Sequence, residues 1–391
     1  MSKTFCPLPW KEIASTPTGS VRLCCSSVSG LNLSKHADGS VAQMTENLEA
    51  GWNTPFFQEV RAQMKSGDSV SACTNCYKLE ASGSPSPRTA WLQKFPDMDP
   101  ADLPTTVGLD QVEQLDLRMG NTCNLRCRMC GPYSSSAWTM EWPLLGDLVS
   151  QPDEKGWQRI RKANWAEDSK SWEQIQKLVP SLKRVYLTGG EPFLVSLNKK
   201  FLASCVSSGE ASHIELRYNT NGTVWDPDLP ELWAQFQKVK VRVSIDGLGA
   251  LNEYIRYPSR WQQILSNLDL LENATRIAPV EISIASTIQA YNVFHVSEFL
   301  RFFQDRNLPV YLDVVHQPSF LSVGVLSPQK TKLARQRLEP MKDYPGVENL
   351  LHLLNSSHHN QWDEFVAFTM KLDDMRKQNL NEIVPEFAQP R

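Results

Sequence analysis

The chain has 391 residues and a mass of 44.3 kDa; 41% of the residues are hydrophobic and 21% are charged. This composition excludes disorder, collagen and coiled coil as the dominant state, and the length suits one barrel-sized domain with a smaller appendage. The net charge of -3 gives no general attraction to nucleic acid or anionic lipid. No stretch approaches the roughly 20 apolar residues that cross a bilayer, and the first ten residues lack a secretion-signal core. We therefore expect a cytoplasmic protein with no nucleic-acid or membrane partner.

The first part of the chain, residues 1–105, is rich in Pro, Ser, Gly and Thr and shows little apolar periodicity. We expect a small domain with short strands there, of a kind that gains stability from a metal site. Because a reducing cytosol disfavours disulfides, its cysteines are expected to bind metal or to act in catalysis. This segment holds five of the nine cysteines: Cys6, Cys24, Cys25, Cys73 and Cys76.

These amino-terminal cysteines suit a closed metal site. Cys6 and Cys24 come from one stretch and Cys73 and Cys76 from another, so four thiolates are available. Tetrahedral sulfur ligation suits zinc and an iron–sulfur cluster alike, and on ligand type both remain open. Cys25 adjoins Cys24 and is the possible substitute for it.

Over residues 106–326, short β-branched runs alternate with helical patterns, which is typical of βα units around a parallel sheet. The strands are expected at Val112–Met119, Arg184–Leu187, His213–Tyr218, Val239–Ile245, Val280–Ser286 and Val310–His316. The helices are expected near Ser134–Met140, Trp172–Val179, Leu197–Ser207, Leu229–Gln237, Trp261–Asn273 and Phe294–Arg306. Six strands predict an α/β fold with a partial (β/α)6 barrel. Residues 327–391 are expected to form a helical extension, with helices over Val347–Leu354 and Glu364–Arg376.

Cys123, Cys127 and Cys130 form a C-x3-C-x2-C array directly after the first of these strands. Three thiolates on one loop can hold three irons of a [4Fe–4S] cluster and leave the fourth iron without a protein ligand. That iron is open to a substrate or cofactor. A structural zinc usually takes four ligands, and no fourth Cys or His lies nearby in the sequence, so zinc is disfavoured here.

The sequence resembles the radical SAM superfamily at four successive motifs. The cysteine array, with Met129 before its last cysteine, is similar to the family's C-x3-C-x-φ-C hallmark. Each of the other three motifs is also ordinary turn chemistry, but they follow the array in the family's order at the carboxyl ends of successive strands, where parallel barrels bind ligands. They are Gly189-Gly190-Glu191-Pro192 (GGEP), Asn219-Thr220-Asn221-Gly222 (TNG) and Ser244-Ile245-Asp246-Gly247 (SxDG).

The resemblance implies that the open iron binds S-adenosylmethionine and that an electron from the cluster cleaves it to a 5′-deoxyadenosyl radical. This radical then removes a hydrogen atom from the substrate. Arg256 occupies the place of an arginine that pairs with the cofactor carboxylate, and a solvated helix charge is the alternative. The cofactor-binding residues that the resemblance implies are Met129, Gly189, Gly190, Glu191, Asn219, Asn221, Ser244, Asp246 and Arg256.

The amino-terminal segment resembles the twitch domain, a shortened form of the SPASM auxiliary-cluster domain. The pattern C-x12-G-x4-C from Cys6 through Gly19 to Cys24, followed by Cys73-x2-Cys76, is similar to that of the family. Gly19 fits a hairpin turn before the second ligand. The resemblance implies a second [4Fe–4S] cluster that accepts or relays an electron. It departs from the usual layout, because twitch and SPASM segments normally follow the barrel.

A few residues outside these motifs carry weaker expectations. His316 ends the sixth strand and is a candidate for proton transfer or substrate contact, with a structural histidine as the alternative. Cys205 lies on an apolar helix face and is expected to be buried. Asp373 and Asp374 are expected to face solvent or a helix N-terminus. His358-His359 is expected to be an exposed turn.

Taken together, the residues predict a radical SAM oxidoreductase or modifying enzyme with two [4Fe–4S] clusters. Its expected substrate is a peptide, a protein or a small polar molecule, and its expected reductant is a partner such as flavodoxin or ferredoxin. A non-catalytic iron–sulfur electron carrier or redox sensor is the alternative, but a carrier has no need of the GGEP, TNG and SxDG elements. Zinc-dependent nucleic-acid binding is disfavoured by the net charge.

Overall fold

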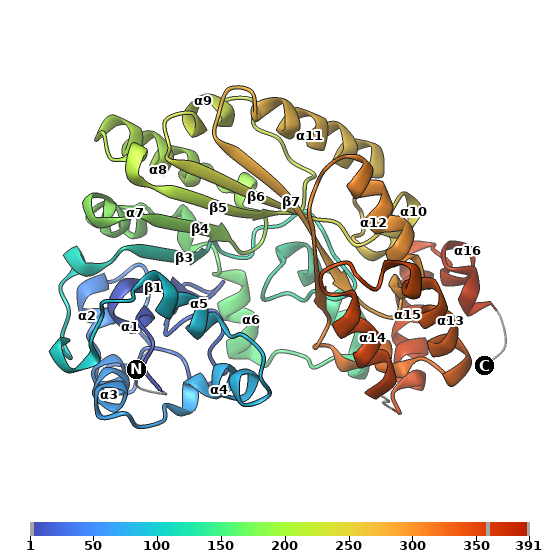
Figure 1. The fold of residues 1–391 in the computed structure, drawn as a ribbon, viewed down its shortest axis with the longest axis horizontal. Helices are drawn as coiled ribbons and strands as arrows, with labels where there is room; N and C mark the ends of the chain where they lie inside the picture. Colours follow the sequence, from blue (N-terminus) through green and yellow to red (C-terminus); the bar gives the residue numbers. More distant parts are fainter. Residues whose placement is uncertain (1–3, 357–359, 389–391) are drawn as a thin grey trace. The chain divides into compact units, whose positions relative to one another are not determined.

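The computed structural model describes residues 4–356 and 360–388. Its strands form one eight-stranded sheet in the order β2-β1-β3-β4-β5-β6-β7-β8, of which Figure 1 labels β1 and β3 to β7. The β1–β3, β3–β4, β4–β5 and β7–β8 pairs are parallel. The α/β class and the six barrel strands predicted from the sequence are confirmed. These strands are β3 (Gln114–Arg118), β4 (Arg184–Thr188), β5 (Glu215–Thr220), β6 (Lys238–Ser244), β7 (Val280–Ile288) and β8 (Val310–Val314).

Two further strands belong to the amino-terminal segment. β1 (Glu12–Ser15) and β2 (Val21–Arg22) form an antiparallel hairpin, and β1 also pairs with β3 in parallel. The predicted turn at Gly19 is confirmed, because this residue has φ +83° between the two strands. The sequence did not predict that this hairpin joins the barrel sheet. β1 has four residues, all buried, so it shows no alternation by which a sheet strand is recognised.

By compactness the chain divides into two units. Unit 1 comprises the chain up to Thr122 together with Gln158–Tyr218 and Asp228–Val239. Unit 2 comprises Cys123–Trp157, Asn219–Pro227 and the chain from Lys240 onward. The segments predicted from the sequence, residues 1–105, 106–326 and 327–391, group the chain by motif, and their bounds stay a prediction.

Unit 1 is more helical at its amino-terminal end than the sequence suggested. Proline at the first helical position begins both α3 (Pro55–Ser66) and α5 (Pro87–Lys94), where its missing N–H costs no hydrogen bond. Figure 1 shows α7 and α8 running beside β4 and β5. The remaining helices of this unit are α1 (Leu8–Lys11), α2 (Leu48–Trp52), α4 (Thr74–Ala81), α7 (Ser169–Gln176), α8 (Ser196–Ser207) and α9 (Leu229–Trp233), while α6 (Glu154–Arg161) joins the two units.

Unit 2 contains the predicted carboxyl-terminal helical extension, which is confirmed, and Figure 1 shows its helices gathered together. The helix predicted at Ser134–Met140 is wrong, because only a 3₁₀ turn forms at Ser136–Thr139. The Ser135 hydroxyl donates to the Leu125 carbonyl at 2.5 Å, so this serine bonds to neighbouring backbone instead of favouring a helix. The helices of unit 2 are α10 (Ala250–Ile255), α11 (Trp261–Ala274), α12 (Val296–Asp305), α13 (Pro328–Leu338), α14 (Val347–Ser356), α15 (Trp362–Arg376) and α16 (Leu380–Ile383).

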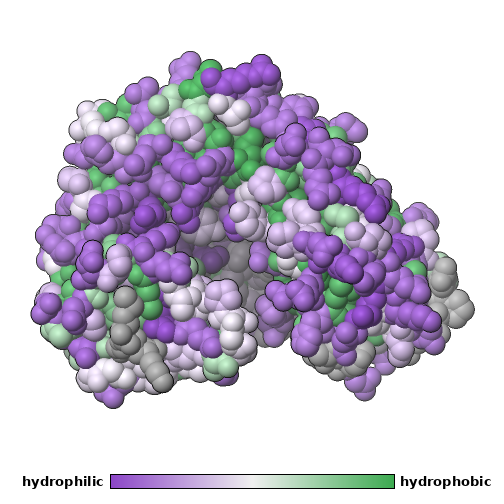
Figure 2. Space-filling view, viewed as in Figure 1, coloured by the Kyte–Doolittle hydropathy of each residue, from purple (hydrophilic) through white to green (hydrophobic). Residues whose placement is uncertain are grey.

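The visible surface is mainly hydrophilic, with hydrophobic side chains in small scattered groups (Figure 2). Large apolar side chains such as Met140 and Met370, which are 79% and 66% exposed, belong to different elements. Scattered apolar residues of this kind are normal on globular proteins. No helix among residues 4–356 and 360–388 is both long and apolar enough to cross a membrane.

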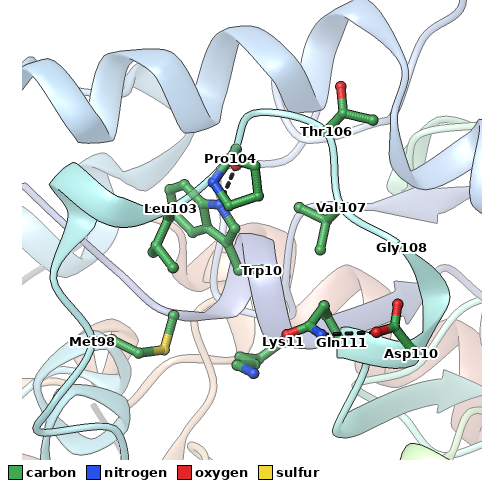
Figure 3. Close-up of a pocket in the computed structure, with 10 residues that line it drawn as sticks. All are labelled: Trp10, Lys11, Met98, Leu103, Pro104, Thr106, Val107, Gly108, Asp110 and Gln111. Atoms are coloured by element: carbon green, nitrogen blue, oxygen red, sulfur yellow. Dashed lines mark hydrogen bonds between the residues drawn. The ribbon is translucent and has the colours of Figure 1, made fainter.

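A cavity of about 380 Å³ lies in unit 1 beside α1 (Figure 3). The Trp10 indole lies in it, and its N–H donates to the Pro104 carbonyl at 2.7 Å. None of the residues predicted to bind a cluster or cofactor lines this cavity, so it carries none of the predicted chemistry. Its lining residues are Trp10, Lys11, Met98, Leu103, Pro104, Thr106, Val107, Gly108, Asp110 and Gln111.

Candidate cofactor and iron–sulfur sites

The three cysteines of the central array lie on a loop whose backbone is fixed on both sides. The Arg126 N–H donates to the Tyr257 carbonyl at 2.6 Å, and the Arg128 N–H donates to the Ile255 carbonyl at 2.8 Å. The buried Cys127 carbonyl accepts the indole N–H of Trp138 at 3.2 Å. The loop is therefore held in place by unit 2 itself, before any metal binds.

The thiols of this loop share a low-dielectric environment. Burial raises the pKa of Cys130 to about 11, and the neighbouring Cys123 adds to the rise. Burial also raises the pKa of Cys127, while the positive charge of Arg256 partly offsets it. Protonated thiols must lose their protons to bind iron, so cluster assembly here releases protons and depends on pH.

No three His, Cys, Asp or Glu side chains among the described residues converge closely enough to hold a single metal ion. A cubane binds each thiolate through a different iron, so its ligands need not converge on one point. The donor chemistry of the central loop, three thiols with one guanidinium beside them, fits a [4Fe–4S] cluster.

The GGEP turn contacts the chain that leads into Cys123. The Gly190 N–H donates to the Gly120 carbonyl at 3.1 Å, and the Glu191 N–H donates to the Thr122 carbonyl at 2.8 Å. A Cβ atom on Gly190 would lie 2.2 Å from the Thr122 oxygen, so only glycine permits this approach. The buried carboxylate of Glu191 accepts the Phe193 N–H at 3.1 Å, and it therefore caps the turn that follows.

We expect the substitution Gly190→Ala to lower the free energy of unfolding by about 3 kcal/mol, because the new methyl group collides with backbone that cannot move alone. Gly209→Ala is the matched control. Gly209 has φ +80° with no atom near its Cβ position, so its backbone strain should cost only about 1 kcal/mol. Urea denaturation of both variants checks the difference, and equal losses would contradict the close approach.

The TNG turn reaches the first cysteine of the loop. The Asn221 amide donates to the Asn124 side-chain oxygen at 3.0 Å and lies 3.8 Å from the Cys123 sulfur. The Asn124 amide donates in turn to the Thr223 hydroxyl at 2.8 Å. Asn221 thus lies beside the cysteine loop, whereas Asn219 is half-buried on β5, and the cofactor contacts of both stay a prediction.

The SxDG element supplies a buried ion pair. The Asp246 carboxylate lies 2.7 Å from Arg256 Nε, and its other oxygen accepts the Thr287 N–H at 2.7 Å. The alternative of a solvated helix charge for Arg256 is wrong, because this residue is only 8% exposed and paired. Its chain neighbours Ile255 and Tyr257 accept backbone hydrogen bonds from the cysteine loop, so Arg256 lies beside that loop, where its charge partly offsets the rise in the pKa of Cys127. Ser244 and Met129 are half-buried, and their cofactor contacts stay a prediction.

The segments that carry the predicted amino-terminal ligands are neighbours within unit 1, because the Tyr77 hydroxyl donates to the Thr4 carbonyl at 3.1 Å and the Asn75 amide donates to the Ser26 carbonyl at 3.0 Å. The charges of Cys24 and Cys73 add to the rise that burial causes in the pKa of Cys6. Burial raises the pKa of Cys24 and that of Cys73 to about 12, and Cys76 adds to the rise at Cys73. Cys25 is exposed, and the charges acting on it beside that of Cys24 come from carboxylates. Cys24 is therefore better placed than Cys25 to join Cys6 and Cys73.

Sequence reasoning missed a buried charge cluster in the same unit. Arg22 lies 3.6 Å from Asp116, and burial together with the Asp116 charge raises the pKa of Glu12 to about 8. Both Asp116 oxygens lack a hydrogen-bond partner among the described residues. The available signal was Asp116 itself, a charged residue inside the strand Gln-Leu-Asp-Leu-Arg.

The remaining expectations have mixed outcomes. Cys205 is fully buried, as predicted. His316 is exposed on the loop after β8, and its role stays a prediction. Asp374 is exposed, whereas Asp373 accepts the backbone N–H of the first residue of α16 and also forms an ion pair that was not predicted. The expected turn at His358-His359 lies outside the described residues.

Comparison with known proteins decides the family. The sequence matches the model of the radical SAM superfamily over residues 117–284, a range that contains the cysteine array and the GGEP, TNG and SxDG motifs. Residues 117–284 therefore form a radical SAM domain. Residues 6–77 match the SPASM iron–sulfur cluster-binding domain, so a SPASM segment precedes the radical SAM domain, as predicted. These two domains imply [4Fe–4S] clusters and S-adenosylmethionine as cofactors.

Similar solved structures include native anSMEcpe with bound AdoMet, at 17% identity and a TM-score of 0.42 over 61% of this radical SAM chain and 62% of that one. SuiB of Streptococcus suis bound to S-adenosylmethionine has 15% identity and a TM-score of 0.38 over 78% of this chain and 64% of that one. SuiB bound to the precursor peptide SuiA has 14% identity and a TM-score of 0.37 over 75% and 64%. The chain thus spans less than two thirds of the length of each. A comparison with curated proteins gave no match.

Proposed function

We propose that this protein is a radical SAM enzyme that modifies a peptide, a protein or a small polar molecule by hydrogen-atom abstraction. The observation that carries the proposal is the three-cysteine loop, which lies beside Asn221 of the TNG turn and Arg256 after the SxDG element. A non-catalytic electron carrier needs neither an open iron nor these elements. All nine cysteines are free thiols, which suits the reducing compartment in which such clusters persist.

The chain's own residues have distinct tasks in this proposal. Cys123, Cys127 and Cys130 hold the cluster, which when bound supplies the electron that cleaves S-adenosylmethionine to the hydrogen-abstracting radical. Arg256 places a positive charge beside the thiolates and so stabilises them. Its ion pair with Asp246 keeps the guanidinium oriented within the buried site. The glycines of the GGEP turn leave room for a close approach of cofactor to backbone.

The amino-terminal site is proposed to hold the second cluster through Cys6, Cys24, Cys73 and Cys76. With four thiolates this cluster has no open iron, so its role is to accept or relay an electron rather than to bind substrate. A protein such as flavodoxin or ferredoxin is the proposed source of electrons for the central cluster.

The protein should release 5′-deoxyadenosine when it is reconstituted anaerobically, reduced with dithionite and given S-adenosylmethionine, even without substrate. The Cys127→Ala variant should lose more than ~100-fold of this activity, because one of three ligands is gone. Cys205→Ala is the matched control and should keep it, since Cys205 is buried outside both sites. Chromatography with mass detection measures the product. Methyl-transfer products without 5′-deoxyadenosine, or no cleavage at all, would contradict the proposal.

A further inference from the structure

Arg128 is a fully buried arginine within the cluster loop, and the proposed chemistry does not use it. It follows Cys127 directly in the chain. Its guanidinium carbon lies 3.6 Å from the ring centre of Tyr254 and 5.5 Å from that of Tyr291. Its Nε donates to the Tyr254 carbonyl at 3.0 Å. A buried guanidinium is costly unless a counter-charge neutralises it, so its partner decides whether the loop is stable.

That partner comes from the carboxyl-terminal extension. Asp373 on α15 accepts a 2.6 Å hydrogen bond from Arg128 Nη2 on its Oδ1 atom. The same oxygen accepts the Tyr254 hydroxyl at 2.9 Å, while Oδ2 accepts the Leu380 N–H at 2.8 Å. Gln378 accepts a further bond from Arg128 at 3.1 Å. The carboxylate is thus held on both oxygens, and it fixes the guanidinium in one place.

A second ion pair connects α15 to the region of the loop. Arg376, one turn after Asp373, donates from Nη2 and Nε to Glu141 at 2.9 and 3.1 Å. Glu141 also lies 2.6 Å from Arg126, the residue before Cys127. Arg376 is fully buried at its side chain, and its guanidinium carbon lies 4.8 Å from the Trp138 ring centre. Both arginines that flank Cys127 are therefore tied, directly or through Glu141, to one turn of α15.

We infer that α15 is a positioning element of the cluster-binding loop, and that Asp373 is its principal positioning residue. The inference rests on the proposed function, in which this loop holds the cluster. Asp373 neutralises Arg128 and so keeps the backbone between Cys127 and Cys130 in the conformation that ligates iron. Without the carboxylate, Arg128 is left as an unpaired buried charge, and the loop must rearrange to reach solvent.

The test compares Asp373→Asn with Asp374→Asn in the full chain. Asp374 is the matched control, because its side chain is 80% exposed and its ion pair, at 3.6 Å, is with the exposed Lys377. Each protein is reconstituted anaerobically and then challenged with an iron chelator, and iron release is followed by absorbance. We expect Asp373→Asn to release about half of its iron roughly ten times faster than the wild type, and Asp374→Asn to match the wild type.

Two further measurements distinguish a role of Asp373 in positioning the loop from a role in the general stability of the fold. Asp373→Glu restores the negative charge, so its rate of iron release should return most of the way to the slow wild-type rate. The paramagnetic resonance spectrum of the reduced protein should change less on addition of S-adenosylmethionine in Asp373→Asn than in the wild type. If Asp373→Asn does not fold, Glu141→Gln, which breaks the second ion pair, should show the faster release. Wild-type release rates in every folded variant would overturn the inference. A wild type that assembles no central cluster would instead overturn the proposed function.

Discussion

Replacement of Cys123, Cys127 and Cys130 by alanine together is expected to remove about four of the eight irons that two cubanes hold in reconstituted protein. It should also abolish formation of 5′-deoxyadenosine. The loop backbone is held by the Tyr257 and Ile255 carbonyls, which the substitutions leave in place, so the variant should remain folded. Iron and sulfide analysis, with circular dichroism as the check on folding, measures the result.

The Cys205→Ala variant is the control for this experiment, because Cys205 is fully buried on α8 within unit 1. It removes a buried thiol without touching either predicted cluster, and it should retain all of the iron. Full iron content in the triple variant would mean that the central loop binds no cluster. Loss of all iron from a folded triple variant would mean that assembly at the amino-terminal site depends on the central one.

Much of the barrel could be predicted, because its signals are local. Five of the six strands contain β-branched residues, helical patterns separate the strands, and the structure places all six within three residues of the predicted bounds. The sites of the motifs were predictable for the same reason, since each turn follows its own strand. In the folded chain Asn221 lies beside Cys123, and the charge of Arg256 acts on the pKa of Cys127. Motif order predicted that these residues lie near one another, while their contacts with the cofactor stay a prediction.

The ties between distant segments could not be predicted. Arg128 and Asp373 are separated by 245 residues, and neither lies in a pattern that indicates the other. From the sequence alone, an aspartate near a helix end is most simply explained as exposed or as a cap. The same holds for β1 and β3, whose pairing joins Glu12 to Gln114 across about a hundred residues of chain. Such contacts depend on tertiary packing, which local periodicity does not encode.

The replacement of Cys73 and Cys76 by alanine, with the central loop intact, separates an auxiliary cluster from a structural zinc. For a cluster, we expect the loss of about four irons and of substrate turnover. Cleavage of S-adenosylmethionine without substrate turnover should persist, because the central cluster keeps its own three cysteine ligands. A zinc site predicts unchanged iron content, loss of zinc and destabilisation of the amino-terminal segment. The free energy that zinc binding contributes to folding is on the order of 10 kcal/mol for isolated zinc modules. Metal analysis of the wild type and the variant distinguishes the two.

Cys25→Ala is the matched control for that experiment and also tests the choice between adjacent cysteines. The charge of Cys24 acts on Cys6 and that of Cys73 acts on Cys24, whereas Cys25 is exposed and neither Cys6 nor Cys73 is among the charges that raise its pKa. Cys25→Ala should therefore keep the full iron content, and Cys24→Ala should lose as much iron as the double variant. If Cys25→Ala loses the iron instead, the ligand assignment shifts by one residue while the cluster remains. Unchanged iron in the Cys73/Cys76 variant would remove the auxiliary cluster and leave the radical SAM domain with a single one.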